Sequence, residues 1–382
     1  MKIKPFLVEE WMNAYETQAT YNIAETCADS ISLEELFTLC EEDLEAFWKS
    51  ISSKRLTYGD IHGYPSFREG ASSLYRTLSP EQIIPTHGAA GANHLAISAL
   101  VNPNDHIISV MPTYQQLYSI PESIGAEVDI LKLTKEDGYQ PDLKKLESLL
   151  RKDTRAIILN NPNNPTGALM SKETLLRIVA LAEKSDAFVF VDEVYRHLVH
   201  DDTYSESIVD LYDKGVSTSS MSKVFSLAGI RLGWIAVKDE ELKAKILSHR
   251  DYNTISCGMI DERIGAVALK DPQKLLKRNR DLVKENLSIL TEWVEKEPLI
   301  TFVRPQAGTT ALLHYDLPIP SREFCLRLLD ETGAFLTPGD CFGEEHSLRI
   351  GYASDTEVLR KGLEAMSGFI KKLQNEQGNP GR

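Results

Sequence analysis

Residues 217–233 read S-T-S-S-M-S-K-V-F-S-L-A-G-I-R-L-G, and the interpretation of the whole chain starts from this segment. Lys223 stands among small hydroxyl residues at the start of a short apolar run, where an ammonium group loses water. Desolvation and a neighbouring cation both favour the neutral amine, which is a nucleophile. Arg231 follows and carries a planar guanidinium that suits a phosphate group. Together they suggest a lysine that holds a phosphorylated carbonyl compound as a Schiff base, and pyridoxal 5'-phosphate (PLP) is the cofactor that needs both.

A lysine between serines is most often an ordinary surface residue, so the spacing of the whole segment matters. Small residues and an arginine surround Lys223 at fixed positions, namely Ser220, Ser222, Ser226, Gly229, Arg231 and Gly233. This pattern resembles the lysine motif of the class I/II aminotransferases, which are PLP-dependent enzymes of fold type I. The resemblance implies that Lys223 forms the Schiff base and that Ser220, Ser222 and Arg231 bind the cofactor.

The composition indicates an acidic protein that is large enough for two domains. At 382 residues the chain exceeds the usual size of one hydrophobic core, and its net charge of −14 opposes binding to nucleic acid or anionic membranes. Its five scattered cysteines lack the C-x-x-C spacing of zinc or redox sites. The N-terminus has no apolar signal-peptide core, and the charge-free stretch 82–104 is interrupted by prolines and glycines. We therefore expect a soluble cytoplasmic protein that binds neither nucleic acid nor membranes.

From Ile83 onward, short apolar runs alternate with segments of helical spacing, which is typical of a largely parallel sheet covered by helices. Strands are predicted at 106–111, 127–133, 155–159, 187–191, 216–219 and 233–237, and helices at 91–100, 171–185 and 240–248. One earlier helix is predicted from Ser32, its N-cap, to Ile51. Beyond residue 272, a helix at 273–296 precedes shorter strands and helices, and the tail 375–382 is expected to fray.

These patterns predict an α/β fold with two domains. By the resemblance, the large PLP-binding domain comprises residues 30–272 and holds a mostly parallel seven-stranded sheet between helices. Residues 1–29 and 273–382, the two ends of the chain, form a smaller α+β domain. The helix at 273–296 is long enough to connect the two domains.

Two motifs suggest where the cofactor lies. The run T-H-G-A-A-G-A-N, residues 86–93, is a glycine-rich turn that leads into a helix, whose free backbone N–H groups can bind phosphate. A tight turn alone would explain the glycines equally well, and the spacing is not that of a dinucleotide fingerprint. The resemblance implies that the amides of Ala89 and Ala90 hold the phosphate. It also implies that Tyr114 stacks on the pyridine ring, although an aromatic residue there is more often part of the core.

Asp192 ends the apolar run A-F-V-F-V, and a buried carboxylate is costly unless it is paired. A protonated pyridine nitrogen would pair with it and would keep the ring an electron sink. Asn164, in N-P-T-G, and Tyr195 match residues that hydrogen-bond the phenolic oxygen of the cofactor in the family. A connecting loop and a half-buried tyrosine with another partner are the plainer alternatives.

Arg349 lies in the apolar run S-L-R-I-G-Y-A and needs an anionic partner there. It matches the family arginine that binds the substrate α-carboxylate through two parallel hydrogen bonds. Tyr58 resembles the tyrosine that reaches the cofactor phosphate of a neighbouring subunit, which implies an obligate homodimer with shared sites. His197 and His200 have a spacing that could serve a metal, but no third ligand is evident, so we expect solvated histidines and no metal.

The resemblance implies an aminotransferase that moves an amino group between an amino acid and a 2-oxo acid through the Lys223 Schiff base. Elimination, replacement or cyclisation stays open, because the reaction depends on which substrate bond stands perpendicular to the ring. A PLP-binding sensor would usually carry a DNA-binding module, for which this chain leaves no room. A nicotinamide dehydrogenase would need the missing fingerprint.

Substrate recognition is the least defined part of the pattern. Many family members carry a glycine-rich segment that touches the substrate where this chain has Y-N-I-A-E-T, residues 21–26. Glu25 is therefore a candidate substrate-binding residue for a basic or guanidino-bearing amino acid, as in aminotransferases and cyclases that handle arginine derivatives. A solvated loop charge is the simpler interpretation of Glu25. Arg250 and Arg263 are candidates for binding a second carboxylate.

Overall fold

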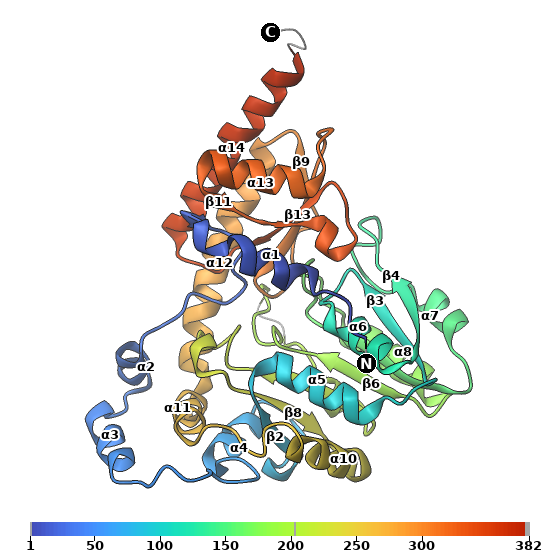
Figure 1. The fold of residues 1–382 in the computed structure, drawn as a ribbon, viewed down its shortest axis with the longest axis vertical. Helices are drawn as coiled ribbons and strands as arrows, with labels where there is room; N and C mark the ends of the chain where they lie inside the picture. The colour runs from blue at the N-terminus through green and yellow to red at the C-terminus, as the bar shows by residue number, and fades with distance from the viewer. Residues whose placement is uncertain (1, 202–203, 379–382) are drawn as a thin grey trace.

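The computed structural model describes residues 2–201 and 204–378, in which a large sheet and a smaller sheet are each accompanied by helices (Figure 1). The large sheet has seven strands in the order β2-β8-β7-β6-β5-β3-β4. Neighbouring strands from β7 to β4 are parallel, whereas β8 is antiparallel to both β7 and β2. The strand bounds are β2 Ile83–Thr86, β3 His106–Met111, β4 Glu127–Lys132, β5 Thr154–Asn160, β6 Phe188–Asp192, β7 Gly215–Ser220 and β8 Gly233–Val237.

Both faces of the large sheet are covered, which explains why its central strands read as continuous apolar runs. On one face, Ile158 and Phe190 belong to a buried cluster with leucines of α5, α6 and α10. On the other face, Ile157 and Val189 belong to a second cluster with residues of α8. The helices in this part are α4 Pro65–Ser72, α5 Gly88–Leu100, α6 Gln116–Ile124, α7 Leu143–Leu149, α8 Lys172–Glu183, α9 Ile208–Leu211, α10 Glu240–Asp251 and α11 Met259–Lys270.

The smaller sheet is antiparallel, with the order β12-β13-β10-β9, and Figure 1 shows it beside the last helices of the chain. The N-terminal segment joins this part, because β1 pairs in parallel with β11 and the Trp11 indole donates to the Leu336 carbonyl at 2.9 Å. The remaining elements are α1 Leu7–Tyr15, β1 Tyr21–Asn22, α12 Pro272–Lys296, β9 Ile300–Phe302, β10 Thr310–Tyr315, α13 Ser321–Thr332, β11 Ala334–Phe335, β12 Thr337–Pro338, β13 Ser347–Gly351 and α14 Thr356–Gly378.

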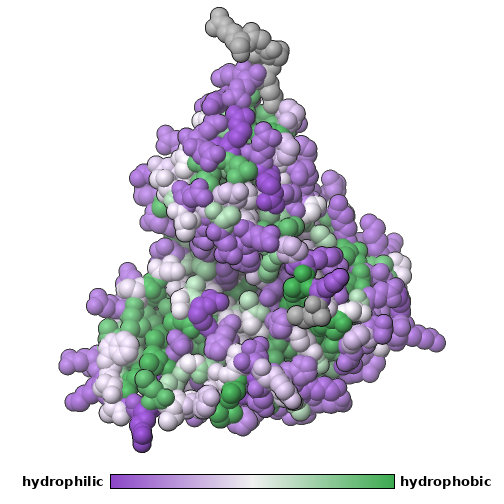
Figure 2. Space-filling model, viewed as in Figure 1, coloured by the Kyte–Doolittle hydropathy of each residue, from purple (hydrophilic) through white to green (hydrophobic). Residues whose placement is uncertain are grey.

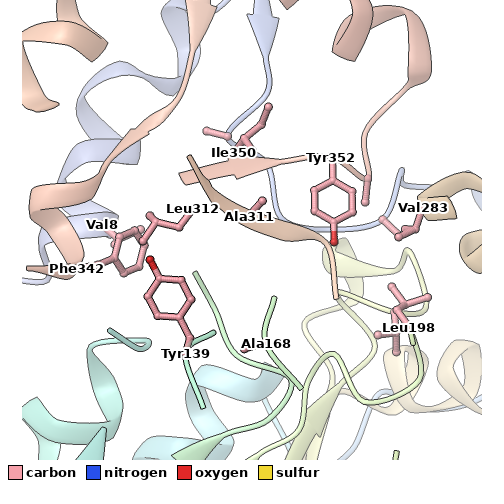
Figure 3. Close-up of a cluster of buried hydrophobic side chains, with 14 of the residues drawn as sticks. Val8, Tyr139, Ala168, Leu198, Val283, Ala311, Leu312, Phe342, Ile350 and Tyr352 are labelled. Carbon is pink, nitrogen blue, oxygen red and sulfur yellow. The ribbon is translucent and has the colours of Figure 1, made fainter. Parts of the chain in front are cut away.

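Buried side chains join the two parts. Figure 3 shows Tyr139, which follows β4, beside Phe342 and the N-terminal Val8, and all three belong to one hydrophobic cluster. The Tyr139 hydroxyl also lies 2.6 Å from a ring nitrogen of His314 on β10. The smaller sheet is therefore fixed against the loops at one edge of the larger one.

The long helix α12 contacts both parts through side-chain amides. Asn279 donates to the carbonyl of Val224 at 2.9 Å, one residue after Lys223. Further along, Asn286 donates to the carbonyl of Ser354, three residues beyond the end of β13, at 2.8 Å. The helix predicted at 273–296 is thus confirmed and spans the junction between the sheets (Figure 1).

The mostly parallel seven-stranded sheet and the strands at 106–111 and 233–237 are confirmed. The single helix predicted from Ser32 to Ile51 is wrong, because two helices occupy this range, α2 Leu33–Cys40 and α3 Leu44–Ser52. Glu41 has a left-handed backbone with φ of 58°, which ends α2, and Asp43 then caps α3. Ser32 is confirmed as the first N-cap, in a capping box with Glu35.

None of the described helices combines the length and apolarity of a membrane span. The proposed domain boundaries, 30–272 against 1–29 with 273–382, stay a prediction. The tail expected to fray is helical as far as Gly378, and residues 379–382 lie outside the described part of the chain.

Candidate functional site

A cavity of about 460 Å³ lies where the carboxyl ends of β5, β6 and β7 meet the N-terminal segment and β13. Parallel strands bring side chains at their carboxyl ends to one edge, and Asn160 and Asp192 are paired in register there. All but one of the sequence-predicted site residues line this cavity. They are Glu25, Ala89, Ala90, Tyr114, Asn164, Asp192, Tyr195, Ser220, Ser222, Lys223, Arg231 and Arg349.

Asp192 is 3% exposed, and burial raises the pKa of its carboxyl above the ordinary value. Two donors and a cation oppose this rise: the Asn93 amide at 2.8 Å, the backbone N–H of Val194 at 3.1 Å, and the charge of Lys223. The Thr218 hydroxyl donates to the Asn93 carbonyl oxygen at 2.6 Å, so that the amide nitrogen faces Asp192. The carboxylate is therefore positioned to receive a cationic group from the cavity.

Asn93 is a site residue that the sequence reasoning missed. It closes the quoted run T-H-G-A-A-G-A-N, and it follows Ala89 and Ala90 by one helical turn. Residues three and four apart share a helix face, so this spacing already placed Asn93 on the side that carries the two alanines. One helix, α5, thus carries both the two alanines at its N-terminus and the hydrogen-bond partner of Asp192.

The start of α5 and Arg231 form a cradle that suits a phosphate. Gly88 has a φ of +70°, and a Cβ atom at this position would lie 3.1 Å from Nη2 of Arg231. Glycine therefore lets the guanidinium approach the helix N-terminus, where the free N–H groups of Ala89 and Ala90 lie and the first turn has no acidic residue. Two sources of positive charge face the same space, as a dianionic phosphate requires.

Lys223 Nζ donates to the Thr26 hydroxyl at 2.7 Å and to Cys27 Sγ at 3.3 Å. Burial alone would lower the pKa of Lys223, but the acidic groups of Cys27, Tyr195 and Glu25 raise it above the ordinary value. The expectation that its surroundings lower the pKa of Lys223 is thus wrong. Burial raises the pKa of Cys27 to about 11, so at neutral pH Glu25 is the anion among these neighbours.

Arg349 is 3% exposed and has no carboxylate partner among the described residues. Its Nη2 donates to the Ala24 carbonyl at 3.2 Å and to the Thr337 hydroxyl at 3.0 Å, and Nη1 lies 3.5 Å from Asn164 Oδ1. Its Nε has no hydrogen-bond partner. Burial lowers the pKa of this guanidinium, and leaving one of its N–H groups unpaired is costly. A buried guanidinium with only neutral acceptors around it is suited to bind an anionic ligand in the cavity.

Glu25 is half-buried in the cavity wall, so the simpler interpretation of a solvated loop charge is wrong. Its Oε1 accepts hydrogen bonds from the backbone N–H groups of Thr26, at 2.6 Å, and Cys27, at 2.7 Å. Burial by itself would raise the pKa of Glu25, but the charge of Lys223 and these bonds lower it. Glu25 is therefore a fixed negative charge beside Lys223.

Tyr58 is the predicted site residue that does not line the cavity. Its side chain is 71% exposed, and it borders a separate hollow together with Arg263. Arg263 stacks on the ring of Tyr64, with 4.3 Å from its Cζ to the ring centroid, and Arg250 donates to the Ile61 carbonyl. Neither arginine lines the cavity of its own chain, so their binding of a second carboxylate stays a prediction.

The two histidines are not solvated, which corrects the prediction. His200 Nε2 lies 2.9 Å from the hydroxyl of Tyr352, and burial lowers its pKa to about 4. His197 packs beside the ring of Phe225, and burial also lowers its pKa. The partners of both histidines, Phe225 and Tyr352, are distant in sequence, so the spacing of the two histidines cannot reveal these contacts. No group of three metal-ligating side chains is found in residues 2–201 and 204–378.

The functional groups that line the cavity match the parts of PLP. The cradle suits its phosphate, Asp192 suits a protonated ring nitrogen, and Lys223 suits its aldehyde. Together with the seven-stranded sheet, this arrangement defines a PLP-dependent protein of fold type I. The family model for aminotransferase class I and II matches residues 32–366, and the chain belongs to this family.

Relatives cover nearly the whole chain. Aspartate aminotransferase from Thermotoga maritima is 30% identical over 350 residues, which are 87% of this chain and 89% of the relative. Capreomycidine synthase from Streptomyces vinaceus is 29% identical over 362 residues, 94% and 92% of the two chains. The crystal structure of a PLP-dependent aminotransferase from Streptococcus suis has a TM-score of 0.95 and 43% identity, and covers 98% of this chain and 99% of that one. The chain is therefore a PLP-dependent enzyme of the aminotransferase superfamily.

The hydrogen bond from Asn93 to Asp192 gives a first prediction. We expect Asn93→Ala to weaken PLP binding at least about tenfold, because a hydrogen bond to a charged group is lost and Asp192 is more easily protonated. Equilibrium titration of the apoprotein with PLP measures this. Asn102→Ala, on the surface after α5, should bind PLP as the wild type does. Equal affinities in all three proteins would contradict the assigned role.

Burial of His200 makes stability depend on pH. Between pH 6.5 and about 4 the unfolded chain binds a proton at this residue that the folded protein does not, so acidification destabilises the fold. At pH 5 the loss is about 2 kcal/mol for this group. We therefore expect His200→Gln to lose less unfolding free energy than the wild type between pH 7 and pH 5, measured by urea denaturation. His249→Gln, at an exposed position on α10, should lose as much as the wild type, and an equal loss in His200→Gln would refute the assignment.

Proposed function

We propose that this protein is an aminotransferase that moves an amino group between an α-amino acid and a 2-oxo acid. One observation carries the proposal: Lys223, Asp192 and the incompletely hydrogen-bonded guanidinium of Arg349 line a single cavity. The first two suit PLP, and the third suits the carboxylate that amino acids and 2-oxo acids share. Members of the family use these two classes of substrate.

Arg349 binds the substrate α-carboxylate, because the described residues give this buried guanidinium only neutral acceptors and no carboxylate. Asn164, 3.5 Å from Nη1, helps to hold the guanidinium in place. Arg349 on β13 and Lys223, three residues beyond the end of β7, line the same cavity, so one small molecule can contact both. Binding at Arg349 thereby orients the Cα atom of the substrate for proton transfer.

PLP, when bound, supplies an electron sink that stabilises negative charge at the substrate Cα. Lys223 Nζ removes the proton from the substrate Cα as a general base and holds it as an ammonium group until the proton is passed on. The Thr26 hydroxyl, 2.7 Å away in the free site, holds the amine at the cavity wall. Asp192 keeps a proton on the ring nitrogen through its negative charge, and Tyr195 and Asn164 bind the phenolic oxygen.

Cyclisation or elimination at the same site is the second candidate, and the similarity to capreomycidine synthase favours it. The name of that relative describes a synthase, although its sequence covers the same part of the chain as the aminotransferases do. Both candidates need Lys223 as the base. They differ in whether a 2-oxo acid is consumed.

We further propose a cytoplasmic homodimer in which Tyr58 completes the site of the partner subunit. Members of the family are typically dimeric. Two further large side chains in the preceding segment are exposed: Leu56, two residues before Tyr58, is 78% exposed, and Trp48 on α3 is 43% exposed. Figure 2 shows apolar surface gathered over the α2–α3 region. Such a patch is typical of a protein–protein interface.

Replacement of the lysine tests the function. We expect Lys223→Ala to reduce amino transfer about 10³-fold or more, because the general base is lost, while the fold is kept. The assay follows conversion of a 2-oxo acid to its amino acid with a panel of amino donors, and circular dichroism checks the fold. Lys371→Ala, on the exposed face of α14, is the control and should retain wild-type rates.

Wild-type turnover by Lys223→Ala would refute the proposal. Release of ammonia, or of a cyclised product, without any added 2-oxo acid would instead support the second candidate.

The shared site can be tested by subunit complementation. Homodimers of Tyr58→Ala and of Lys223→Ala should each be impaired, because each affects both sites. A mixed dimer has one doubly altered site and one unaltered site, so co-refolded equal mixtures should recover about a quarter of wild-type activity. Recovery is measured as turnover per protomer. Mixtures no more active than the parent variants would show that Tyr58 does not act across an interface.

A further inference from the structure

One face of α1 forms part of the cavity wall, and it is polar and acidic. Four of its cavity-lining residues are spaced i, i+3, i+4 and i+7, which puts them on one side of the helix: Glu9, Met12, Asn13 and Glu16. Val8 also lines the cavity and is buried beside them, and Trp11 is buried on the side away from the cavity-lining residues. Glu16 directly follows the last residue of α1 and starts a short 3-10 turn.

The position of α1 is fixed by contacts at both of its sides. The backbone N–H of Leu7 donates to Oε1 of Gln115 at 2.9 Å, and the Gln115 amide donates to the Pro5 carbonyl at 2.8 Å. Near the middle of the helix, the Trp11 indole donates to the Leu336 carbonyl. The acidic face is therefore held over the cavity by both the large and the small sheet regions.

The charges that line the cavity do not balance once the cofactor and an α-carboxylate are assigned. Within the described residues the lining has three cationic side chains, Lys223, Arg231 and Arg349. Each is already assigned: Lys223 to covalent attachment of the cofactor, Arg231 to its phosphate, and Arg349 to the α-carboxylate. Of the lining carboxylates, Asp192 is assigned to the pyridine nitrogen, which leaves three without a role toward the cofactor or the α-carboxylate: Glu9, Glu16 and Glu25, the last of them beside Lys223.

Glu9 and Glu16 retain acceptor capacity. Oε1 of Glu9 accepts from the Tyr114 hydroxyl at 3.1 Å, and Oε1 of Glu16 accepts from the Asn22 amide at 3.1 Å. Each has a second oxygen without a hydrogen bond from the described part of the chain, and neither forms an ion pair there. Both partners are neutral, so they orient the carboxylates without cancelling their charge.

A second, independent feature points to a ligand with charge at both ends. Arg349, 3% exposed, has an unpartnered Nε and lines the same cavity, so it calls for an anion. Glu25 and Glu9 lie close enough to attract its guanidinium electrostatically. An α-carboxylate at Arg349 therefore lies within reach of the acidic wall. A second carboxylate on the substrate would meet repulsion there, whereas a distal cation would be attracted.

We propose that Glu9 and Glu16, together with Glu25, form a subsite for the positively charged side chain of an α-amino acid, either a guanidinium or an ammonium group. The inference rests on the proposed function, because it takes the α-carboxylate to lie at Arg349. Two carboxylates on fixed elements can accept the several N–H donors of such a group. The acidic wall thereby selects against aspartate-like substrates as well as for basic ones.

Arginine and citrulline provide the test, since they have nearly the same shape and differ in the charge of the terminal group. With the PLP-loaded enzyme, we expect kcat/KM for arginine to exceed that for citrulline by at least about tenfold. Lysine and aspartate complete the panel. A higher value for arginine than for lysine assigns the guanidinium, the reverse assigns the ammonium, and aspartate should be the poorest of the four.

Charge-neutralising variants locate the subsite. Glu9→Gln and Glu16→Gln should each reduce the arginine-to-citrulline ratio of kcat/KM about tenfold. Glu10→Gln is the matched control: it removes the same charge from α1 at an exposed position outside the cavity and should keep the wild-type ratio. A wild-type ratio near one, or a ratio that both cavity variants retain, would overturn the proposal.

Binding to the Lys223→Ala protein separates this inference from the proposed function. Calorimetry with arginine and citrulline reports the subsite even when no turnover occurs. If Lys223→Ala binds arginine more tightly than citrulline, and the double variant Lys223→Ala/Glu9→Gln does not, the subsite is supported even if the enzyme proves not to be an aminotransferase. Equal binding of the two amino acids overturns the subsite even if the enzyme transfers amino groups.

Discussion

A carboxylate buried at the end of β6 is the constraint on which the site depends. Removing Asp192 from water is costly, and the protein supplies two neutral donors, with the nearest full positive charge on Lys223. A protonated ring nitrogen of the cofactor would supply the missing compensation. The helix that donates to Asp192 through Asn93 also ends, at its N-terminus, beside the cradle that suits a phosphate. Because α5 is one continuous element, it would fix two distant points of the cofactor with respect to one another.

On the substrate side of the cavity, the buried charge that lacks full compensation is a positive one. Arg349 is a cation whose burial is only partly compensated by carbonyl and hydroxyl groups, and a substrate carboxylate would complete its environment. The walls around it come from opposite ends of the chain: α1 and the segment that contains Glu25 near the N-terminus, and β13 near the C-terminus. The backbone carbonyl of Glu25 packs so closely on β13 that a Cβ atom on Gly351 would lie 1.7 Å from it. The absence of a side chain at Gly351 therefore lets the Glu25 segment lie directly against the strand of Arg349.

Much of the fold and of the cofactor site could be predicted from the sequence, because both are recorded in local patterns. Apolar runs mark the central strands, since these are buried on both faces, and the spacing around Lys223 is specific enough to indicate the cofactor. The features that were missed depend on distant contacts. His200 is buried by Tyr352, and Glu25 acquires its environment from Lys223. The break at Glu41 also lacked a signal, because a residue other than glycine adopts the left-handed backbone there. The spacing of Glu9 and Glu16 is enough to predict an acidic face on α1, but the sequence does not show that this face borders the cavity.

The helix α12 contacts the chain beside both charged groups to which the proposed function assigns the substrate. Asn279 holds the backbone next to Lys223, and Asn286 holds the backbone that follows the strand of Arg349. Both contacts lie on one continuous helix, two turns apart, so the helix sets the spacing between the segments that carry Lys223 and Arg349. Under the proposed function, substitutions that bend or rotate α12 would change which length of molecule fits between these groups, without altering any residue that the molecule touches. The tolerance for substrate size would then be set in part by a helix outside the cavity.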